Sequence, residues 1–391
     1  MIQIVRQIII RACLCFIALG AYETKANTQT GVERWTVSTS TRGTRTHDAA
    51  PRRYRNLFVE ILGKTQAETN AKLEQAFQQL FHGTRSDQPI YYELAGGTQA
   101  QIMDVANNDV RSEGQSYGMV IAVQMDKQAE FDKLWAYAST CMQQPSGMFS
   151  WLMTPGSCHA ISTKVAPDGD EYFAMAMVLA SRRWGKSSSG VDYGIEARKI
   201  LSALANTENG EFNADPPIVT FGPGMQFSDP SYVLPLFYSE WARFDPANRT
   251  FWESATTYAR THFSKVCNPN TGLAPYLANF DGTVRNSAFN ADAWRVPMNI
   301  MMDYNLNHAD PWQDTYAKTH AAYWAKNGIG SGAGMIGINA MLAFALPPAD
   351  AKPFLQAAWG AATPTGKYRY YSGCLYLLSM LHLSGRFDLF E

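Results

Sequence analysis

The sequence lacks a charge excess, interdomain linkers and internal repeats. Its 33 Lys and Arg residues are balanced by 34 Asp and Glu residues, a formal net charge of −1, so it has no basic surface of the kind that binds nucleic acid or anionic membranes. No stretch is rich enough in Pro, Gly or Ser to separate two domains, and no fixed-period repeat indicates a helical solenoid. No cysteine spacing matches a zinc site. We therefore expect one domain that acts on a neutral partner.

Apolar and aromatic residues, by contrast, are abundant. Hydrophobic residues make up 46% of the 391 positions, which is enough for a large buried core. Aromatic residues make up 13%, and some of them, such as Tyr368, Tyr370 and Tyr371, lie near glycines rather than within apolar runs. Aromatic faces stack against sugar rings, but large helical domains also bury many aromatics. The composition therefore fits a carbohydrate partner without requiring one.

Residues 1–26 have the pattern of a secretory signal peptide. Arg6 and Arg11 occur before the first acidic residue, and the short apolar core Ala12–Leu19 is followed by small residues. This core is too short to span a membrane comfortably. A retained membrane anchor is the alternative interpretation. We expect a secreted protein, extracellular or periplasmic, that has no membrane contact after cleavage and is a monomer.

The mature chain would keep four of the six cysteines, which do not form a disulfide scaffold. Export to an oxidising compartment allows one bridge among them. The loop most readily closed is the interval between Cys141 and Cys158, which are 17 positions apart in the sequence.

Helices are expected to dominate after a polar N-terminal segment. Residues 27 to about 55 are rich in Thr and Arg and predict an extended segment. Beyond it, apolar residues recur at three- and four-residue spacing, which predicts helices. They are expected over residues 66–82, 114–142, 170–184, 192–206, 230–244, 247–265, 290–306, 311–325, 334–346, 351–359 and 370–383. Paired helices without a convincing series of strands predict an all-α fold, best satisfied by a closed ring of helix pairs.

The stretch 114–142 is predicted to be one amphipathic helix. From Gly118 onward, Ile121 and Leu134 fall on one side of a helical projection, and Asp126 and Glu130 fall on the other.

Three segments combine acids, aromatics and glycines where predicted helices begin. The first is residues 109–118, in which Ser112 is expected to cap a helix and Glu113 to occupy its first turn. The second, residues 166–173, contains Asp168. The third, residues 290–299, places Asp292 three positions before Arg295.

Each of these segments also has a purely structural interpretation. Acids are favoured at helix N-termini, and an acid three residues before an arginine often forms only a surface ion pair. Hydrolysis of a glycosidic bond, however, needs two carboxyl groups in different environments, one to donate a proton and one to stay ionised. The recurrence of acids with aromatics therefore favours a carbohydrate-active site.

At these residues the sequence resembles glycoside hydrolase family 8. The resemblance begins with Ser-Glu-Gly-Gln-Ser-Tyr-Gly-Met and spans nearly the whole mature chain in order. The matching motifs are residues 112–119, 122–128, 166–174, 227–235, 292–295 and 365–373. The resemblance implies an (α/α)6 barrel of helix hairpins as one catalytic domain over residues 27–391, and hydrolysis with inversion and without cofactor or metal.

The resemblance also implies roles for individual residues. Glu113 matches the general acid, Asp292 the general base, and Asp168 the acid that holds the distorted sugar at the cleavage subsite. An inverting enzyme leaves room for water, with its carboxyl groups roughly 6.5–9.5 Å apart. Burial and nearby acids are expected to raise the pKa of Glu113. The residues expected to bind or orient the substrate and water are Tyr117, Tyr232, Arg295 and Tyr371.

The resemblance is strongest to the xylan-acting members, because residues 167–173 and 366–371 match them. The expected partner is xylan or xylo-oligosaccharides, and the preferred activity is endo-1,4-β-xylanase. One argument for endo action is that residues 345–350 lack the His-Leu pair expected of reducing-end xylose-releasing exo-oligoxylanases. The other is export, because a secreted enzyme meets polymer. The exo-oligoxylanase is the main alternative. A β-1,4-endoglucanase, a polysaccharide lyase, a helical-repeat interaction protein and a non-catalytic carbohydrate-binding protein are further ones.

Overall fold

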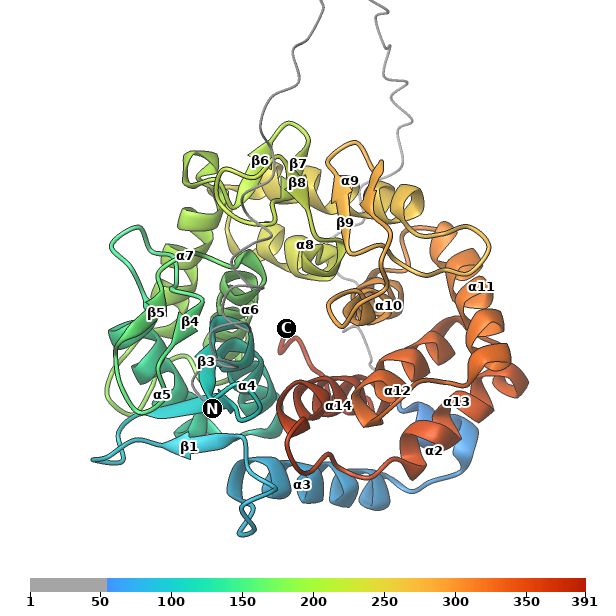
Figure 1. Cartoon of the computed structure of the whole chain (residues 1–391), viewed down its shortest axis with the longest axis horizontal. Coiled ribbons are helices and arrows are strands. Elements are labelled where there is room, and N and C mark those ends of the chain that lie inside the picture. The colour runs from blue at the N-terminus through green and yellow to red at the C-terminus, as the bar shows by residue number, and fades with distance from the viewer. Residues whose placement is uncertain (1–54) are drawn as a thin grey trace, which may run out of the picture. The chain divides into compact units, whose positions relative to one another are not determined.

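The computed structural model describes residues 55–391, whose helices form two concentric rings (Figure 1). Each helix of the inner ring contacts the next, and the last contacts the first, so the ring is closed. The inner helices are α4 (Ser112–Met125), α6 (Pro167–Arg183), α8 (Pro235–Phe244), α10 (Val296–Asn307), α12 (Ala333–Ala340) and α14 (Arg369–Leu383).

A second set of helices packs around this ring, each against one inner helix. The outer helices are α3 (Gln66–His82), α5 (Gln128–Tyr137), α7 (Tyr193–Ala205), α9 (Arg249–Val266), α11 (Trp312–Asn327) and α13 (Pro348–Gly360). A short helix, α2 (Leu57–Leu62), precedes α3 and contacts α13. Outer and inner helices alternate along the chain, so the predicted (α/α)6 barrel is confirmed.

Sequence pattern explains which helix lies where. α4 has no charged residue after Glu113 and is buried on nearly every face, as expected of a helix enclosed on all sides. α3 instead buries Leu73, Phe77 and Leu80 on one stripe and exposes Gln75 and Gln78. Its capping box, in which Thr65 and Glu68 bond each other's backbone amides, fixes where it begins.

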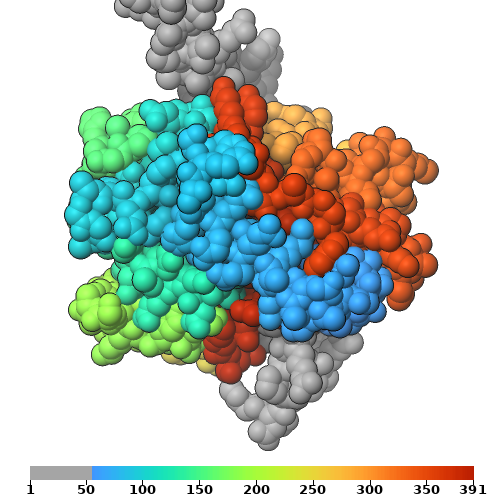
Figure 2. Space-filling view, turned by 90° about the horizontal axis from the view of Figure 1, so that it is seen from below, coloured from blue at the N-terminus to red at the C-terminus, as the bar shows by residue number. Residues whose placement is uncertain are grey.

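The ends of the chain segment described here lie side by side. α3 contacts α14, and α2 contacts α13. Figure 2 shows the blue helices near residue 60 and the red C-terminal helices covering the same face.

Short antiparallel strands, which the sequence pattern did not predict, connect the helices. They form a five-stranded sheet in the order β1 to β5, a three-stranded sheet and a hairpin. The strands are β1 (Tyr91–Glu93), β2 (Ala100–Asp104), β3 (Asp109–Arg111), β4 (Leu152–Met153), β5 (Ala160–Ser162), β6 (Phe212–Ala214), β7 (Pro217–Val219), β8 (Phe227–Ser228), β9 (Leu277–Asn279) and β10 (Val284–Asn286). Each has five residues or fewer, too few for alternation to be recognised.

The prediction of one amphipathic helix over 114–142 is wrong. α4 ends at Asp126, whose φ of 62° is left-handed and reverses the chain into α5. A π-helix, η2 (Ala138–Met142), then extends α5. The inner helix α4 is buried on nearly every face, whereas the outer helix α5 is buried on one side. Treating both as one amphipathic helix concealed this difference.

Ser112 is not the helix cap that the sequence suggested. Arg111 occupies that position without a side-chain cap, and Ser112 is the first residue of α4. Its amide instead donates to the Trp151 carbonyl at 3.0 Å, because β3 pairs with β4 directly before the helix.

Other predicted helices are interrupted by 3₁₀ turns. η4 (Pro230–Tyr232) precedes α8, η5 (Ala293–Arg295) precedes α10, and η6 (Met341–Ala345) follows α12. A further turn, η3 (Thr207–Asn209), follows α7.

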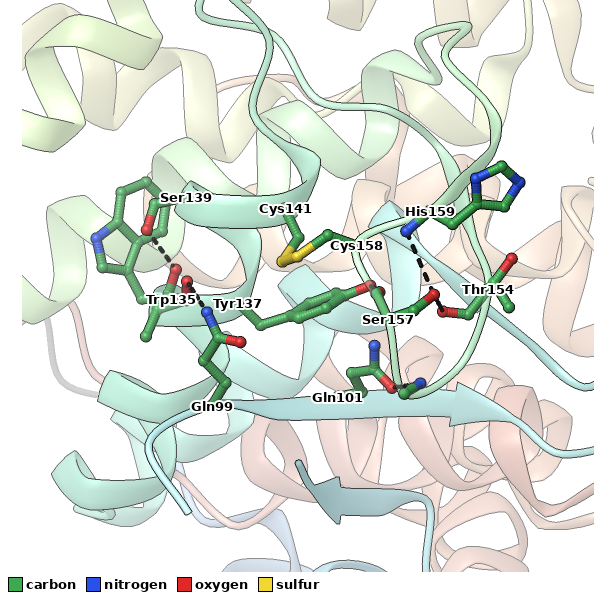
Figure 3. Close-up of a disulfide and its surroundings, with 12 residues drawn as sticks. Gln99, Gln101, Trp135, Tyr137, Ser139, Cys141, Thr154, Ser157, Cys158 and His159 are labelled. Carbon is green, nitrogen blue, oxygen red and sulfur yellow. Dashed lines mark hydrogen bonds between the residues drawn. A yellow bond between two sulfur atoms is a disulfide. The ribbon is translucent and has the colours of Figure 1, made fainter. Parts of the chain in front are cut away.

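The predicted disulfide between Cys141 and Cys158 is present (Figure 3). It joins η2 to the loop between β4 and β5. The loop is also held by Tyr137, whose hydroxyl donates to the Ser157 carbonyl at 2.8 Å, and by Gln101, whose side-chain oxygen accepts from the Gly156 amide at 2.8 Å. Cys267 and Cys374 are buried free thiols.

The predicted signal peptide and most of the predicted extended segment lie outside the described residues. Within residues 55–391, no helix combines the length and the apolarity needed to cross a membrane.

Candidate active site

Glu113 lies in the first turn of α4, immediately after β3 and Ser112. Its Oε2 accepts a hydrogen bond from Arg295 Nη1 at 3.0 Å, and its Oε1 accepts one from the Tyr370 hydroxyl at 3.0 Å. The side chain is 14% exposed. This carboxyl group is therefore held from two sides and keeps limited access to solvent.

Arg295 connects the site residues to one another. It is 2% exposed and lies at the end of η5. Its Nη1 lies 2.6 Å from Asp168 Oδ2 and 2.8 Å from the Tyr117 hydroxyl, in addition to Glu113, and its Nη2 donates to Ser231 Oγ at 2.7 Å. One nitrogen with two hydrogens thus serves three oxygens, which brings α4 and α6 to a common point.

Asp168 enters the site from the first turn of α6 and is 3% exposed. Its Oδ1 accepts from the Gly169 amide at 2.9 Å, as an acid at a helix N-terminus does. Gly169 packs directly on α4, since a Cβ there would lie 2.3 Å from Ser112 Oγ. The glycine therefore permits the approach of the two helix ends that carry Asp168 and Glu113.

Asp292 precedes η5 and is the most accessible of the three acids, with a side chain 38% exposed. Its Oδ1 lies 3.6 Å from Arg295 Nη2. Asp292 and Arg295 are therefore not a surface ion pair. Arg295 is buried, and its guanidinium joins Asp292 to Glu113 and Asp168.

The predicted tyrosines take different positions. Tyr117 is buried and bonds Arg295. The ring of Tyr232 lies 5.4 Å from the Arg295 guanidinium and is stacked on Phe221. The Tyr371 hydroxyl donates to the Ala291 carbonyl at 2.8 Å, next to Asp292.

A cavity of about 830 Å³ opens over this cluster. Among the predicted site residues, Glu113, Asp292 and Tyr371 line it, while Asp168, Tyr117, Tyr232 and Arg295 do not. Other parts of its wall come from Trp294, residues 331–335, residues 362–365, Lys367 and Tyr368. Its volume lies in the range of small-molecule sites, and its aromatic residues suit a sugar.

Residues 345–350, which supported endo action in the sequence, do not line this cavity. They lie where η6 passes into α13. The argument for endo action from these residues therefore finds no support in the cavity wall.

Tyr370 and Ser231 contact the site but were not predicted. Tyr370 reaches Glu113 from α14, 257 positions away in the sequence. A signal for it exists in Gly114, where a Cβ would lie 2.3 Å from the Tyr370 ring. Ser231 is held by Asp229, whose side chain accepts from the Ser231 amide at 2.8 Å.

The electrostatics differ between the acids. Burial raises the pKa of Glu113 to about 7, assisted by the charges of Asp168 and Asp292 and opposed by Arg295. Burial also raises the pKa of Asp168, against the effect of Arg295. Three carboxyl groups around one guanidinium favour retention of a proton on one of them. Glu113 is thus suited to donate a proton near neutral pH.

Within residues 55–391, no group of three or more His, Cys, Asp or Glu side chains is arranged to hold a metal ion.

Comparison with known proteins gives a consistent result. The sequence profile described as "Glycosyl hydrolases family 8" matches residues 52–385. The reducing-end xylose-releasing exo-oligoxylanase Rex8A of Paenibacillus barcinonensis is 38% identical over 373 residues, covering 86% of this chain and 97% of that protein. The exo-oligoxylanase of Halalkalibacterium halodurans is 36% identical over 377 residues, covering 86% and 95%.

The solved structure of Rex8A in complex with xylose superposes with a TM-score of 0.82 at 36% sequence identity. It covers 87% of this chain and 98% of that chain. The similarity therefore includes the arrangement of the helices as well as the motifs.

Proposed function

The chain belongs to glycosyl hydrolase family 8, and we propose that it hydrolyses β-1,4-xylosidic bonds in xylo-oligosaccharides and releases xylose from the reducing end. The observation that carries the proposal is the similarity to two exo-oligoxylanases over at least 95% of their length. It replaces endo action as the preferred activity, and one of the two sequence arguments for endo action rested on residues that do not line the cavity.

In the proposed reaction Glu113 is the general acid. Its raised pKa of about 7 keeps it protonated in mildly acidic solution, and it reaches the cavity where a glycosidic oxygen would lie. Transfer of its proton to that oxygen makes the leaving sugar a neutral alcohol. Arg295 and Tyr370 then stabilise the carboxylate that remains, because both donate hydrogen bonds to it.

Asp292 is the proposed general base. Its carboxylate is partly exposed and lines the cavity, so it can take a proton from a water that attacks the anomeric carbon. Attack by water opposite the leaving group inverts that carbon. Arg295, 3.6 Å away, orients the base. The roles that the resemblance implies for Asp168 on the sugar ring and for Tyr232 on the water stay predictions, because neither residue lines the cavity.

Endo-xylanase activity is the second candidate, and one feature of the cavity favours it. Ser331, Gly332, Ala333 and Gly334 form part of the wall, and their side chains are small. Such a wall leaves room for a longer chain.

Product analysis separates the two activities. The enzyme is incubated with xylotetraose carrying ¹³C at the reducing-end anomeric carbon, beside polymeric xylan, carboxymethylcellulose and chitosan. We expect all label in free xylose at early times, with polymer almost untouched. A ladder of oligosaccharides from xylan would establish the endo activity instead, and products from cellulose or chitosan alone would contradict xylan specificity. Early NMR spectra test inversion, which gives a new α-anomer first.

We also propose that the protein is exported and acts as a monomer. The signal-peptide pattern of residues 1–26 supports export, and the Cys141–Cys158 disulfide is of the kind that persists in oxidising compartments. Mass spectrometry of the mature N-terminus tests cleavage before residue 27, and light scattering tests the monomer.

A further inference from the structure

A second pair of carboxyl groups lies behind the site and has no part in the reaction proposed above. Asp170, in the first turn of α6, is 1% exposed, and Glu211, directly before β6, is 0% exposed. The pKa of each carboxyl group reflects a side-chain hydrogen bond to the other. Asp170 Oδ2 and both Glu211 side-chain oxygens have no donor among the described residues.

These unpartnered oxygens point to a proton held within the pair. Ionised carboxylates only accept hydrogen bonds, so two of them cannot bond each other. Two buried like charges in contact are also strongly unfavourable. One proton on the pair removes both problems, because a carboxylic acid can donate to the neighbouring carboxylate.

Asp170 connects this pair to the backbone of Glu113. Its Oδ1 accepts from the Phe149 amide at 2.9 Å. Two residues further on, the Trp151 carbonyl accepts from the Ser112 amide at 3.0 Å, and Ser112 directly precedes Glu113. Asp170 also lies two residues after Asp168 in the same helical turn, and Gly169 between them packs on Ser112.

Glu211 supplies a fixed partner for Asp170. Its carbonyl accepts from the Thr220 amide at 2.8 Å, and the Thr220 hydroxyl donates to the Gly210 carbonyl at 2.8 Å. The hairpin β6–β7 therefore holds the Glu211 backbone, and the pair fastens α6 and the 149–151 segment to that hairpin.

We propose that Asp170 and Glu211 share one proton and act as positioning residues, which fix Asp168 and the backbone of Glu113 for hydrolysis. The catalytic part of this inference rests on the proposed function, because it takes Glu113 and Asp168 to act on the sugar. The proton sharing stands on the contact alone.

The charged groups around the pair determine its response to pH. Asp168 and Glu171 face it from α6 itself, Arg295 of η5 is bonded to Asp168, and Tyr238 of α8 is bonded to Glu171. Burial raises the pKa of Glu211 to about 8 and holds the pKa of Asp170 well above its usual range.

The sign of the pH effect on stability follows from these directions. The unfolded chain loses both protons near pH 4, whereas the folded pair keeps one to about pH 8. Stability from the pair is therefore fully present in acid and is lost as pH rises toward 8.

The test compares Glu211→Gln, Asp170→Asn and the double variant by thermal unfolding between pH 5 and pH 9. An amide can donate to the remaining carboxylate without a shared proton. We expect each single variant to flatten the fall of Tm with pH by the same amount, and the double variant to flatten it no further. Glu208→Gln, exposed on η3, is the control and should keep the wild-type slope.

Kinetics test the positioning role on whichever glycan the wild type hydrolyses. At pH 6, Glu211→Gln should keep kcat within about threefold, whereas Glu211→Ala should lower kcat by about tenfold or more with a smaller change in KM, because misplaced catalytic groups lose rate.

Two results would overturn the inference. If the double variant flattened the fall of Tm with pH by the sum of the two single effects, Asp170 and Glu211 would each hold a proton of their own. A Glu211→Ala variant with lower Tm but wild-type kcat would show a purely structural pair. Absence of any hydrolysis by the wild type would refute the proposed function while leaving the Tm test intact.

Discussion

At the scale of single residues, Arg295 explains why three acids can coexist in a confined site. Its guanidinium contacts Glu113 and Asp168 directly and lies near Asp292. Charge is balanced only in part, so a proton on Glu113 is favoured. The same cation then stabilises Glu113 once it has lost that proton. One arginine thus serves both protonation states of the proposed acid.

Replacing Glu113 by Gln removes the transferable proton and keeps the shape of the side chain. We expect kcat to fall by roughly 10²–10⁴-fold with little change in substrate affinity, measured by initial rates and by calorimetric titration with xylotetraose. For the wild type, kcat/KM should fall above about pH 7, where Glu113 loses its proton. Wild-type turnover in the variant would remove Glu113 from the mechanism; Glu208→Gln is a surface control.

Tyr370 and Tyr371 form a matched pair for a second test. The Tyr370 hydroxyl donates to Glu113, whereas the Tyr371 hydroxyl donates to the Ala291 carbonyl. Tyr370→Phe removes a donor to the carboxylate, so the pKa of Glu113 should rise further. The basic limb of kcat/KM should move to higher pH by about one unit, since a hydrogen bond to a charged group contributes about 1.5–3 kcal/mol. Tyr371→Phe should leave the limb in place, and equal shifts in both would contradict the assignment.

At the scale of elements, the sequence prediction agrees with the structure where a candidate catalytic acid lies at the start of a single helix. Glu113 and Asp168 lie at helix starts that the sequence marks with glycines and acids. Tyr370 was missed because its contact joins two distant helices. The strands were missed because they are too short for a periodic pattern, and the break at Asp126 was missed because an αL turn has little apolar signature. Features set by neighbouring residues, such as helix starts, can therefore be predicted from the sequence. Contacts between distant helices cannot, because they form only when the ring of helices closes.

The disulfide allows a prediction about one connection. Cys141→Ser opens a loop of 17 residues, and chain-entropy arguments give a loss of about 3 kcal/mol in the free energy of unfolding. Denaturation by urea would measure it. The double variant Cys141→Ser, Cys158→Ser should match the single variant and be insensitive to reductant. Stability equal to that of the wild type would show that η2 and the 154–158 loop are held by their hydrogen bonds alone.

At the scale of the whole molecule, buried histidines limit stability in acid. Burial lowers the pKa of His382 to about 3 and those of His262 and His320 to about 4. The unfolded chain binds these protons near pH 6.5, so the stability they contribute is present above that pH and is lost as pH falls through the folded values.

His382→Phe tests this directly, because His382 is buried and stacks on Phe387 with ring centroids 3.9 Å apart. We expect a smaller loss of Tm between pH 6.5 and pH 4 than in the wild type. His82→Gln, which changes an exposed histidine, is the surface control. An unaltered slope in His382→Phe would show that His382 does not contribute to acid unfolding.

The contact between α14 and α4 also determines when the chain can become active during its synthesis. A ribosome that has translated the chain as far as Arg295 has made every carboxylate and the arginine of the proposed reaction. The chain still lacks Tyr370, and the inner face of α4 still lacks the neighbour that completes the ring. Because non-local contacts of this kind form late, activity should appear only when the C-terminal helix has left the ribosome. A chain that stops before Arg369 would have an incomplete ring and would be sensitive to proteolysis.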